Sequence, residues 1–325
     1  MAGNIPREKD MFVVGGESLI DLVPVSAAPG AERQALPGGS PFNCAIALSK
    51  LGNSTGFLCP ISQDEHGDLL LAPLAEASVN VLLSERVPEA TTKAIVTFNE
   101  KMQASYVFER GADRAFTREG LLAALPAQVE LYQIGGFAPI LAEDAQKWLP
   151  VVKAAIGRGA TISIDINVRE KLVDDEEGYR ARLSEFLDFA HIIKLSDEDH
   201  AWLEPGATIE EHAQLLLDRP NCELVVVTMG EEGSRAFSNV ASGKAGIYAP
   251  PVFGDTVGAG DSLMAGILTW LHETGALKLG ALGALDQAAL ETTLRFGAVV
   301  AGLNCAQKGC KPPTRAEVDA VLAGS

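Results

Sequence analysis

The sequence predicts a doubly wound α/β fold, in which helices cover both faces of a mostly parallel sheet. Short apolar runs alternate with longer runs of helical spacing along the whole chain. Several short runs are apolar at nearly every position, which is typical of parallel strands covered on both faces. The 325 residues, 47% of them hydrophobic, can bury a large core as one domain or two. Because no repeat or flexible linker interrupts them, we expect a single domain over residues 1–325.

The short apolar runs are the predicted strands of the main sheet. In chain order they are residues 11–15, 56–61, 130–134, 161–166, 191–195 and 224–228. Helices are predicted where apolar residues recur every three or four positions, among them 142–156 and 179–189. Two more helices begin with capping boxes, the Thr-x-x-Glu patterns that start at Thr208 and Thr314.

Two segments interrupt this alternation. Residues 91–109 alternate apolar and polar positions on both sides of a polar turn at 99–101, which predicts an antiparallel hairpin. Residues 17–36 fit no helix that would connect parallel strands. By themselves, such segments would be additions to an edge of the sheet.

Composition and charge exclude several classes of protein. The net charge of −17 argues against nucleic acid or an anionic membrane as a partner. No apolar run approaches the roughly 18 residues of a membrane span, and residues 1–10 lack the apolar segment of a signal peptide. We therefore expect a cytoplasmic protein. The five cysteines form no Cys-x-x-Cys pair, which predicts reduced, mostly buried thiols rather than disulfides or a zinc site.

The most informative stretch is residues 254–266, Gly-Asp-Thr-Val-Gly-Ala-Gly-Asp-Ser-Leu-Met-Ala-Gly. From Ser262 the apolar residues have helical spacing, which continues to Thr274, and Gly275 is placed to end the helix. The small residues 258–260 therefore lie where this helix begins. Unpaired N–H groups and the positive end of the dipole attract anions at such a point.

Asp261 follows these small residues in the first turn of the predicted helix. Gly258, Ala259 and Gly260 have little or no side chain to keep a transferring phosphoryl group from the backbone donors. We expect the helix dipole to keep Asp261 ionised, so that it can take a proton from an alcohol. Phosphoryl transfer needs little proton abstraction until late, so a modest base suffices. The alternative is a tight turn in which Asp261 only caps the helix.

A second informative run spans residues 37–52, Pro-Gly-Gly-Ser-Pro-Phe-Asn-Cys-Ala-Ile-Ala-Leu-Ser-Lys-Leu-Gly. The pair Gly38 and Gly39 leads into a helix of small residues, which Gly52 is placed to end. Asn43 lies in the first turn, where its amide can both donate to and accept from hydroxyl groups. Taken alone, this run would be a loop followed by a surface helix.

The two runs resemble the C-terminal and N-terminal motifs of the ribokinase-like (PfkB) family of sugar and nucleoside kinases. They stand in the family's order, about 200 residues apart, and the resemblance covers nearly the whole chain. It implies a kinase that uses ATP and Mg²⁺, with K⁺ as a further candidate cofactor. It also implies that insertions at about 17–36 and 91–110 build a small β-sheet lid over the sugar, which often forms a homodimer contact in the family.

The resemblance further implies which residues hold the sugar. Asp21 comes a few residues after the first strand, near the edge where open α/β sheets bind ligands, and the family places a substrate-binding aspartate there. The segment Asp165-x-Asn167-x-Arg169 ends another strand at this edge and resembles a segment of fructokinases. The implied sugar site comprises Asp21, Gly38, Gly39, Asn43, Asn167 and Arg169. Without the resemblance, each would be an ordinary loop residue.

The implied nucleotide site lies at the ends of two predicted strands. It comprises Lys194, Ser196, Thr228, Gly230, Gly233 and Gly260. Where the family commonly has Asn-x-x-Glu to organise Mg²⁺ through water, this chain has Ser196 and Asp199. Asp199 is therefore a candidate for that role, although Ser-x-x-Asp is also an ordinary capping pattern. Asp255, together with Lys308 and Gly309, resembles a loop that borders a monovalent cation.

The sequence thus predicts an ATP-dependent kinase for a primary hydroxyl of a small sugar. Asp261 would take the hydroxyl proton, and the amides of 258–260 would stabilise the γ-phosphoryl group. The chain contains no Gly-x-x-x-x-Gly-Lys-Ser/Thr sequence, which excludes a P-loop kinase. Residues 106–114 also look more like fructokinases than like ribokinases, so fructose is the expected substrate. The alternatives are 2-keto-3-deoxygluconate or another sugar, and a catalytically silent scaffold.

Overall fold

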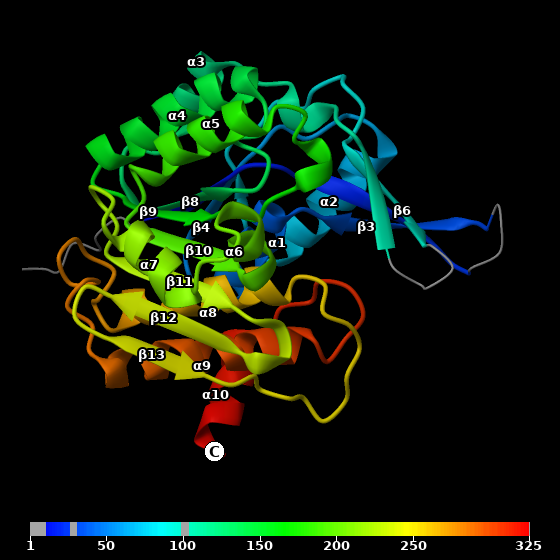
Figure 1. Cartoon of the computed structure of the whole chain (residues 1–325). Coiled ribbons are helices and arrows are strands. Elements are labelled where there is room, and N and C mark those ends of the chain that lie inside the picture. The colour runs from blue at the N-terminus through cyan, green and yellow to red at the C-terminus, as the bar shows by residue number, and fades with distance from the viewer. Residues whose placement is uncertain (1–10, 27–30, 99–103, 325) are drawn as a thin grey trace, which may run out of the picture.

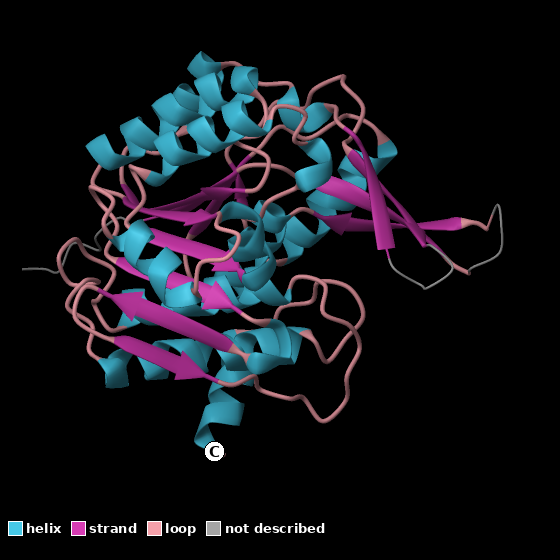
Figure 2. Cartoon of the chain, in the orientation of Figure 1, coloured by secondary structure: helices cyan, strands magenta, loops and turns pink. Residues whose placement is uncertain are grey.

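The computed structural model describes residues 11–26, 31–98 and 104–324 of the chain. Within them, a nine-stranded sheet has helices on both faces, and a four-stranded sheet projects beside it (Figures 1 and 2). The expected doubly wound α/β architecture with a smaller second sheet is confirmed. That the whole chain forms a single domain stays a prediction.

The main sheet is parallel over most of its width. In sheet order its strands are β13 (Ser242–Ala245), β12 (Ser234–Ser238), β11 (Leu224–Thr228), β10 (Ile192–Ser196), β9 (Thr161–Asp165), β8 (Val129–Gly135), β1 (Met11–Gly15), β4 (Thr55–Leu58) and β5 (Asn80–Val81). Neighbours from β11 to β5 are parallel, whereas β12 and β13 are antiparallel. All six predicted strands are present. The sequence did not predict β12 and β13, because Ser-Arg-Ala-Phe-Ser and Ser-Gly-Lys-Ala are not apolar enough.

Each face of the sheet is covered by its own helices and its own hydrophobic core. One core contains residues of α1 (Ser40–Lys50), α2 (Glu65–Glu76), α8 (Ala259–Glu273), α9 (Gln287–Asn304) and α10 (Arg315–Ala323). The other contains residues of α3 (Arg118–Ala124), α4 (Ala142–Gly157), α5 (Glu176–Leu187) and α7 (Ile209–Leu217), with α6 (Asp197–Leu203) packed against it. The central strands are therefore shielded on both sides, as their apolar sequences require.

Local signals in the sequence explain where several helices begin. Both predicted capping boxes form, at Thr208 before α7 and at Thr314 before α10. The prediction that a helix begins at 179 was three residues late, because Asp175 caps α5 by accepting the Gly178 N–H at 2.9 Å. Gly275, with φ 71°, follows α8 as expected.

The smaller sheet is formed by the two segments that interrupt the alternation. Its order is β3 (Arg33–Gly38), β2 (Leu19–Pro24), β6 (Lys93–Phe98) and β7 (Ala104–Glu109). The predicted hairpin pairs β6 with β7, and Ala94 lies opposite Phe108. Its predicted turn at 99–101 lies outside the described residues. We refer to these four strands as the lid sheet.

The expectation that the cysteines are mostly buried is confirmed. Cys44, Cys59, Cys222 and Cys305 are buried and Cys310 is partly buried, and all five are free thiols. In the part of the chain that the structure describes, no helix has the length and apolar character needed to cross a membrane.

Candidate active site

The two informative runs form the N-terminal ends of two packed helices. Gly39 precedes α1 with φ 110°, and a Cβ at this position would lie 2.9 Å from the Glu17 carbonyl. Gly258 precedes α8 with φ 73°, and a Cβ there would lie 2.3 Å from Sγ of Cys310. Both positions thus require glycine for backbone conformation and for space. With these turns formed, α1 and α8 begin side by side at the carboxyl edge of the sheet.

Asp261 joins the two helices. Its Oδ1 accepts a hydrogen bond from Oγ of Ser40 at 2.6 Å, and its Oδ2 accepts one from Nδ2 of Asn43 at 2.9 Å. Asp261 lies in the first turn of α8, as predicted, and does not act as its N-cap, which is Gly258. Asn43 contacts the carboxylate and also lines the cavity described below, so part of its hydrogen-bonding capacity is used within the protein.

Burial, which the sequence analysis did not consider, has the largest effect on the pKa of Asp261. Burial raises the pKa of the Asp261 carboxyl above its ordinary value, while the hydrogen bonds from Ser40 and Asn43 and the charges of Lys194 and Arg169 act in the opposite direction. The carboxyl is therefore a stronger base than a solvated aspartate. A base with a raised pKa drives proton abstraction from a hydroxyl more effectively once it is ionised.

Of the three backbone N–H groups at 258–260 that were predicted to bind an anion, one already has a partner within the protein. The N–H of Ala259 donates to the Thr256 carbonyl at 3.1 Å. The predicted anion-binding site, called the anion cradle below, therefore depends on the neighbouring N–H groups of Gly258 and Gly260. A Cβ on Gly260 would lie 3.3 Å from Nζ of Lys194, so this glycine leaves room between the backbone and an ammonium group.

A cavity of about 660 Å³ opens beside these helix ends. It brings together ten of the residues predicted from sequence: Asp21, Gly39, Asn43, Asn167, Arg169, Lys194, Gly258, Ala259, Gly260 and Asp261. The lid sheet contributes Tyr106 and Phe108 to the wall. Residues far apart in the sequence, from both motifs and both lid segments, therefore share one cavity.

At the lid end of the cavity, Asp21 and Arg169 have opposite charges. Burial raises the pKa of Asp21 to about 6, and the charge of Arg169 opposes this shift. Gly38 lies beside Asp21 in the lid sheet, and a Cβ there would lie 2.6 Å from Oδ2 of Asp21. Arg169 donates to Oδ1 of Asn167 at 2.5 Å, and Asn167 has φ 46°, so this turn is held by its own side chains.

Lys194 enters the cavity from β10 as half of a buried ion pair. Its Nζ lies 3.0 Å from both carboxylate oxygens of Asp165 on β9, and both residues are at least nine-tenths buried. Burial acts most strongly and would lower the pKa of Lys194, but the carboxylates of Asp165, Asp199 and Asp261 together outweigh it and keep the pKa above its ordinary value. The ammonium is therefore charged and held beside Gly260.

The other predicted nucleotide residues lie along the same sheet edge, outside the lining of this cavity. Ser196 and Thr228 are register partners at the ends of β10 and β11. Gly230, with φ 51°, and Gly233, with φ 89°, form the turn after β11. Within the main sheet, β11 lies on the side of β10 that is farther from β1.

The two candidate metal residues use their carboxylates within the protein. Asp199 accepts the N–H groups of Val168 and Ser196 at 2.7 and 2.8 Å, so Ser196 and Asp199 form the capping box that was the alternative expectation. Asp255 accepts the N–H groups of Val257 and Gly309 at 3.0 and 2.8 Å, and thereby borders the predicted loop. No group of three acidic, histidine or cysteine side chains suited to a metal ion occurs among the described residues.

Several residues of the cavity were not predicted from the sequence, among them Ser40, Glu198 and Glu17. Ser40 is in the second motif, but its contact with Asp261 depends on how the helices meet. Glu198 is exposed and lines the cavity, next to the capping Asp199. Glu17 lines the cavity although it is only 3% exposed, and its only signal in the sequence is its position just after β1.

Comparisons with known proteins agree with this geometry. A family model described as pfkB family carbohydrate kinase matches residues 9–317. A probable fructokinase-4 of Arabidopsis thaliana is 29% identical, over 98% of this chain and 98% of the relative. Fructokinase-2 of Solanum lycopersicum is 28% identical, over 100% and 99%. A crystal structure of fructokinase with bound ATP from Xylella fastidiosa superposes with a TM-score of 0.86 at 25% identity, over 97% and 99% of the two chains.

Proposed function

The chain belongs to the pfkB family of carbohydrate kinases and is therefore an ATP-dependent sugar phosphotransferase; on this premise, we propose that it transfers the γ-phosphate of ATP to a primary hydroxyl of fructose. The observation that carries the proposal is the position of Asp261. Its carboxylate lies at the start of α8, is bound by Ser40 and Asn43 from α1, and faces the cavity.

In the proposed mechanism, the sugar lies at the lid end of the cavity, where Asp21, Asn43 and Arg169 can bind its hydroxyls. Asp261 accepts the proton of the attacking hydroxyl as the bond to phosphorus forms and the bond to the leaving ADP oxygen breaks. The N–H groups of Gly258 and Gly260 and the Lys194 ammonium stabilise the charge of the phosphoryl group. These donors are already in place, so little reorganisation is needed.

The nucleotide occupies the remaining part of the sheet edge in this proposal. Lys194 would meet its phosphates, and Ser196, Thr228, Gly230 and Gly233 would contact it further along the edges of β10 and β11. This arrangement leaves the lid end of the cavity to the sugar. It also directs the terminal phosphate toward the start of α8, where the positive end of the dipole favours an anion.

The family implies a divalent metal ion, and we propose Mg²⁺. Asp199 and Asp255 already accept two backbone N–H groups each. This fits an ion held mainly by phosphate oxygens and water, as Mg²⁺ commonly is, with Glu198 facing it from the cavity wall. The ion would neutralise phosphate charge. We further propose that K⁺ binds beside the Asp255 loop.

Fructose is proposed because the relatives that match over nearly the whole chain are named as fructokinases. One observation favours a second substrate. Arg169 places a cation in the lid end of the cavity, where it could pair with the carboxylate of a sugar acid such as 2-keto-3-deoxygluconate. A silent scaffold is disfavoured because Asp261 and the glycines before it are intact and Asp261 is in contact with Asn43.

We also propose a homodimer through the lid sheet. Val107 is 57% exposed on β7, which is an edge strand, and Val25 after β2 is 62% exposed. An exposed apolar edge of this kind is a typical site for a second copy. The free thiols are compatible with the expected cytoplasmic location.

An assay of ADP release with a panel of sugars tests the proposed function. The panel should contain fructose, 2-keto-3-deoxygluconate, ribose and glucose, with Mg²⁺ present. We expect the highest kcat/KM for fructose, and phosphorus NMR should show the phosphate on a primary carbon. A higher value for the sugar acid would replace fructose as the substrate. If ATP bound but no sugar stimulated ADP release, the scaffold alternative would be favoured.

A further inference from the structure

Glu17 is a buried carboxyl group between the main sheet and the lid sheet. It follows β1 by two residues and precedes β2 by two, and it is 3% exposed while lining the cavity. Its Oε2 accepts a hydrogen bond from the N–H of Phe137 at 3.2 Å. Gly136 has φ 56°, and a Cβ there would lie 2.6 Å from Oε1 of Glu17. The turn after β8 is thus fitted closely around this carboxylate.

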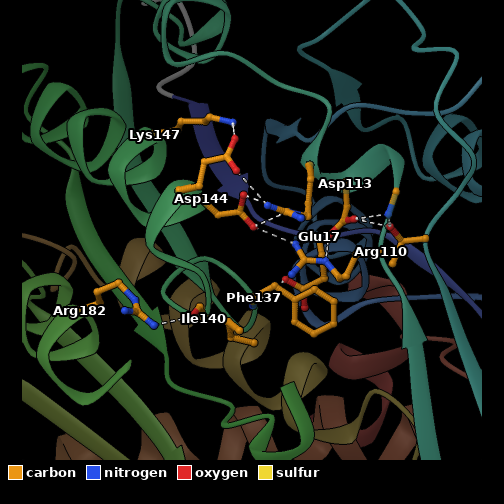
Figure 3. A network of polar contacts seen from close by, with 12 residues as sticks. Glu17, Arg110, Asp113, Phe137, Ile140, Asp144, Lys147 and Arg182 are labelled. Carbon is orange, nitrogen blue, oxygen red and sulfur yellow. Dashed lines mark hydrogen bonds and ion pairs between the residues drawn. The ribbon is translucent and has the colours of Figure 1, made fainter. Parts of the chain in front are cut away.

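The side chain of Phe137 connects the turn that binds Glu17 with the lid sheet. Its ring lines the cavity and meets the ring of Phe108, on β7, edge to face at 5.4 Å. The guanidinium of Arg110, one residue after β7, lies 4.4 Å from the centre of the same ring. Glu17 therefore holds the residue against which the end of the lid strand packs (Figure 3).

Arg110 is in turn fixed from the other side. It donates to Oδ2 of Asp113 at 2.7 Å and lies 3.4 Å from Oδ2 of Asp144, which also binds Arg114 at 3.0 Å (Figure 3). Asp144 belongs to α4, on a face of the main sheet. The Phe137 ring therefore lies between a fixed cation and the Glu17 hydrogen bond, and its position depends on both.

We propose that Glu17 is a positioning residue for the sugar, because its ionised carboxylate holds Phe137, and through it Phe108, as the wall against which the sugar packs. The inference rests on the proposed function, in which the sugar occupies the lid end of the cavity. The carboxylate itself does not take part in proton transfer. It acts through the turn at Gly136 and the two aromatic rings.

The surroundings of Glu17 make this role dependent on pH. Burial raises its pKa to about 7, while hydrogen bonds from its own N–H and from Phe137, and the charges of Arg169 and Arg110, favour the ionised form. The charged and titratable groups that face it include Arg110 after β7, Arg169 after β9 and the thiol of Cys59 after β4. A hydrogen bond to an ionised acceptor is roughly twice as strong as one to a neutral acceptor. Protonation near pH 7 therefore loosens the Phe137 turn.

The test is sugar affinity as a function of pH, in the full-length protein. Binding of the best sugar of the panel is measured by calorimetry without ATP, between pH 5.5 and 8.5, and KM and kcat are measured over the same range. For the wild type, we expect Kd and KM for the sugar to rise about five- to tenfold as the pH falls through 7. The KM for ATP should stay within about twofold. A second rise in the Kd and KM for the sugar is expected near pH 6, where Asp21 becomes protonated.

The Glu17→Gln variant distinguishes the rise in the sugar Kd near pH 7 from the rise near pH 6. The amide oxygen still accepts the Phe137 N–H, but it carries no charge and does not titrate. We expect sugar affinity at pH 8 to drop to the level of the wild type below pH 7, the rise near pH 7 to vanish and the rise near pH 6 to remain. The kcat at saturating sugar should change by less than about twofold, since a positioning residue acts on binding.

Two further variants complete the experiment. Phe137→Leu keeps the backbone N–H but removes the ring through which Glu17 acts, so sugar affinity should fall at pH 8 and the rise in Kd near pH 7 should shrink. Glu85→Gln, at an exposed position away from the cavity, should retain the wild-type profile. A Glu17→Gln variant with an unchanged profile, or with kcat lost and KM retained, would overturn the proposal. If no sugar were phosphorylated at any pH, the proposed function would fail first, and this inference with it.

Discussion

Asn43 and Asp261 are 218 residues apart in the chain, yet Nδ2 of Asn43 donates to Oδ2 of Asp261 at 2.9 Å. Each follows a glycine N-cap with positive φ, at Gly39 and Gly258. The two sequence motifs therefore meet at the Asp261 carboxylate, where the starts of two helices hold the amide proposed to bind the sugar and the carboxylate proposed to accept its proton within hydrogen-bond distance. Substitutions around this contact should affect three properties differently: the ionisation of Asp261, the binding of an anion at the start of α8 and the stability of the fold.

Ser40→Ala should shift the pH dependence of turnover. Its hydroxyl donates to Oδ1 of Asp261 and lowers the pKa of that carboxyl, against the larger effect of burial. Without it the pKa rises further, so a higher pH is needed to ionise the base. We expect the acidic limb of kcat/KM to move up by about one pH unit, with a loss of roughly tenfold at low pH and a smaller loss at pH 8.

Ser49→Ala is the matched control for this change. Ser49 lies on the same helix and donates to the Ala77 carbonyl at 2.5 Å, away from the cavity. The pH profile of kcat/KM for Ser49→Ala should match that of the wild type in shape and position. If Ser40→Ala left the acidic limb where it is, the hydroxyl would have no part in setting the ionisation of Asp261.

Alanine at Gly258 and alanine at Gly260 should have different effects. At Gly258, φ 73° and the Cys310 sulfur 2.3 Å from the new Cβ predict a loss of about 1–3 kcal/mol in the free energy of unfolding. At Gly260, the new methyl group meets only Nζ of Lys194, at 3.3 Å, and alanine suits a helix. Gly260→Ala should therefore fold as stably as the wild type but lose turnover, because the methyl group occupies the anion cradle.

Urea unfolding and steady-state kinetics on both variants check this contrast. Full activity in Gly260→Ala would show that no phosphoryl group approaches this backbone. Unchanged stability in Gly258→Ala would mean that the turn before α8 can relax away from Cys310.

The buried ion pair of Asp165 and Lys194 should contribute both to the stability of the fold and to turnover. Asp165→Asn leaves an ammonium group without its carboxylate, which typically costs about 3–5 kcal/mol in a buried site. The double variant Asp165→Asn/Lys194→Met removes both charges, so we expect it to recover much of this stability but none of the turnover. A double-mutant cycle from urea unfolding measures the coupling. Additive effects, or an active double variant, would contradict the role given to the ammonium.

Glu17 should make folding stability fall as the pH rises. Its pKa is raised by burial from 4.5 to about 7 in the folded protein, so the folded state binds a proton more tightly than the unfolded chain does. The associated stability is complete below pH 4.5 and is lost as the pH rises through 7. Relative to the wild type, Glu17→Gln should therefore gain stability between pH 4.5 and 8, by about 3 kcal/mol at the upper end.

Unfolding by urea at several pH values measures this gain, with Glu85→Gln as the control. A constant difference between Glu17→Gln and the wild type across the whole range would show that Glu17 does not titrate there. Together with the binding measurements, this test separates the ionisation of Glu17 from its effect on the sugar.

Much of the fold was predictable because its signals are local. The strand 224–228 is apolar at every position but the last, and the capping boxes at Thr208 and Thr314 depend on residues three positions apart. The strands β12 and β13 were not predicted, because their pairing depends on neighbouring strands rather than on their own sequence.

The site was predictable only in part, for a related reason. Asp261 and Gly258 stand in a motif whose spacing is visible in the chain, whereas the ionisation of Asp261 depends on burial and on Ser40, which the fold brings to it. The same holds for Glu17, whose burial and contact with Phe137 appear only in three dimensions. The capping role of Asp199 was one of two interpretations of a local pattern, and its reciprocal hydrogen bonds with Ser196 form that cap.

The most direct test of the account is Asp261→Asn, assayed for both sugar binding and turnover. Asparagine has nearly the same shape but cannot accept the hydroxyl proton. We expect calorimetric sugar affinity close to that of the wild type and a fall in kcat of about 10²–10⁴, as is typical when a general base is lost. Asp286→Asn, at the N-cap of α9, is the control and should retain activity. Full turnover in Asp261→Asn would contradict the central claim that this carboxylate removes the sugar's proton.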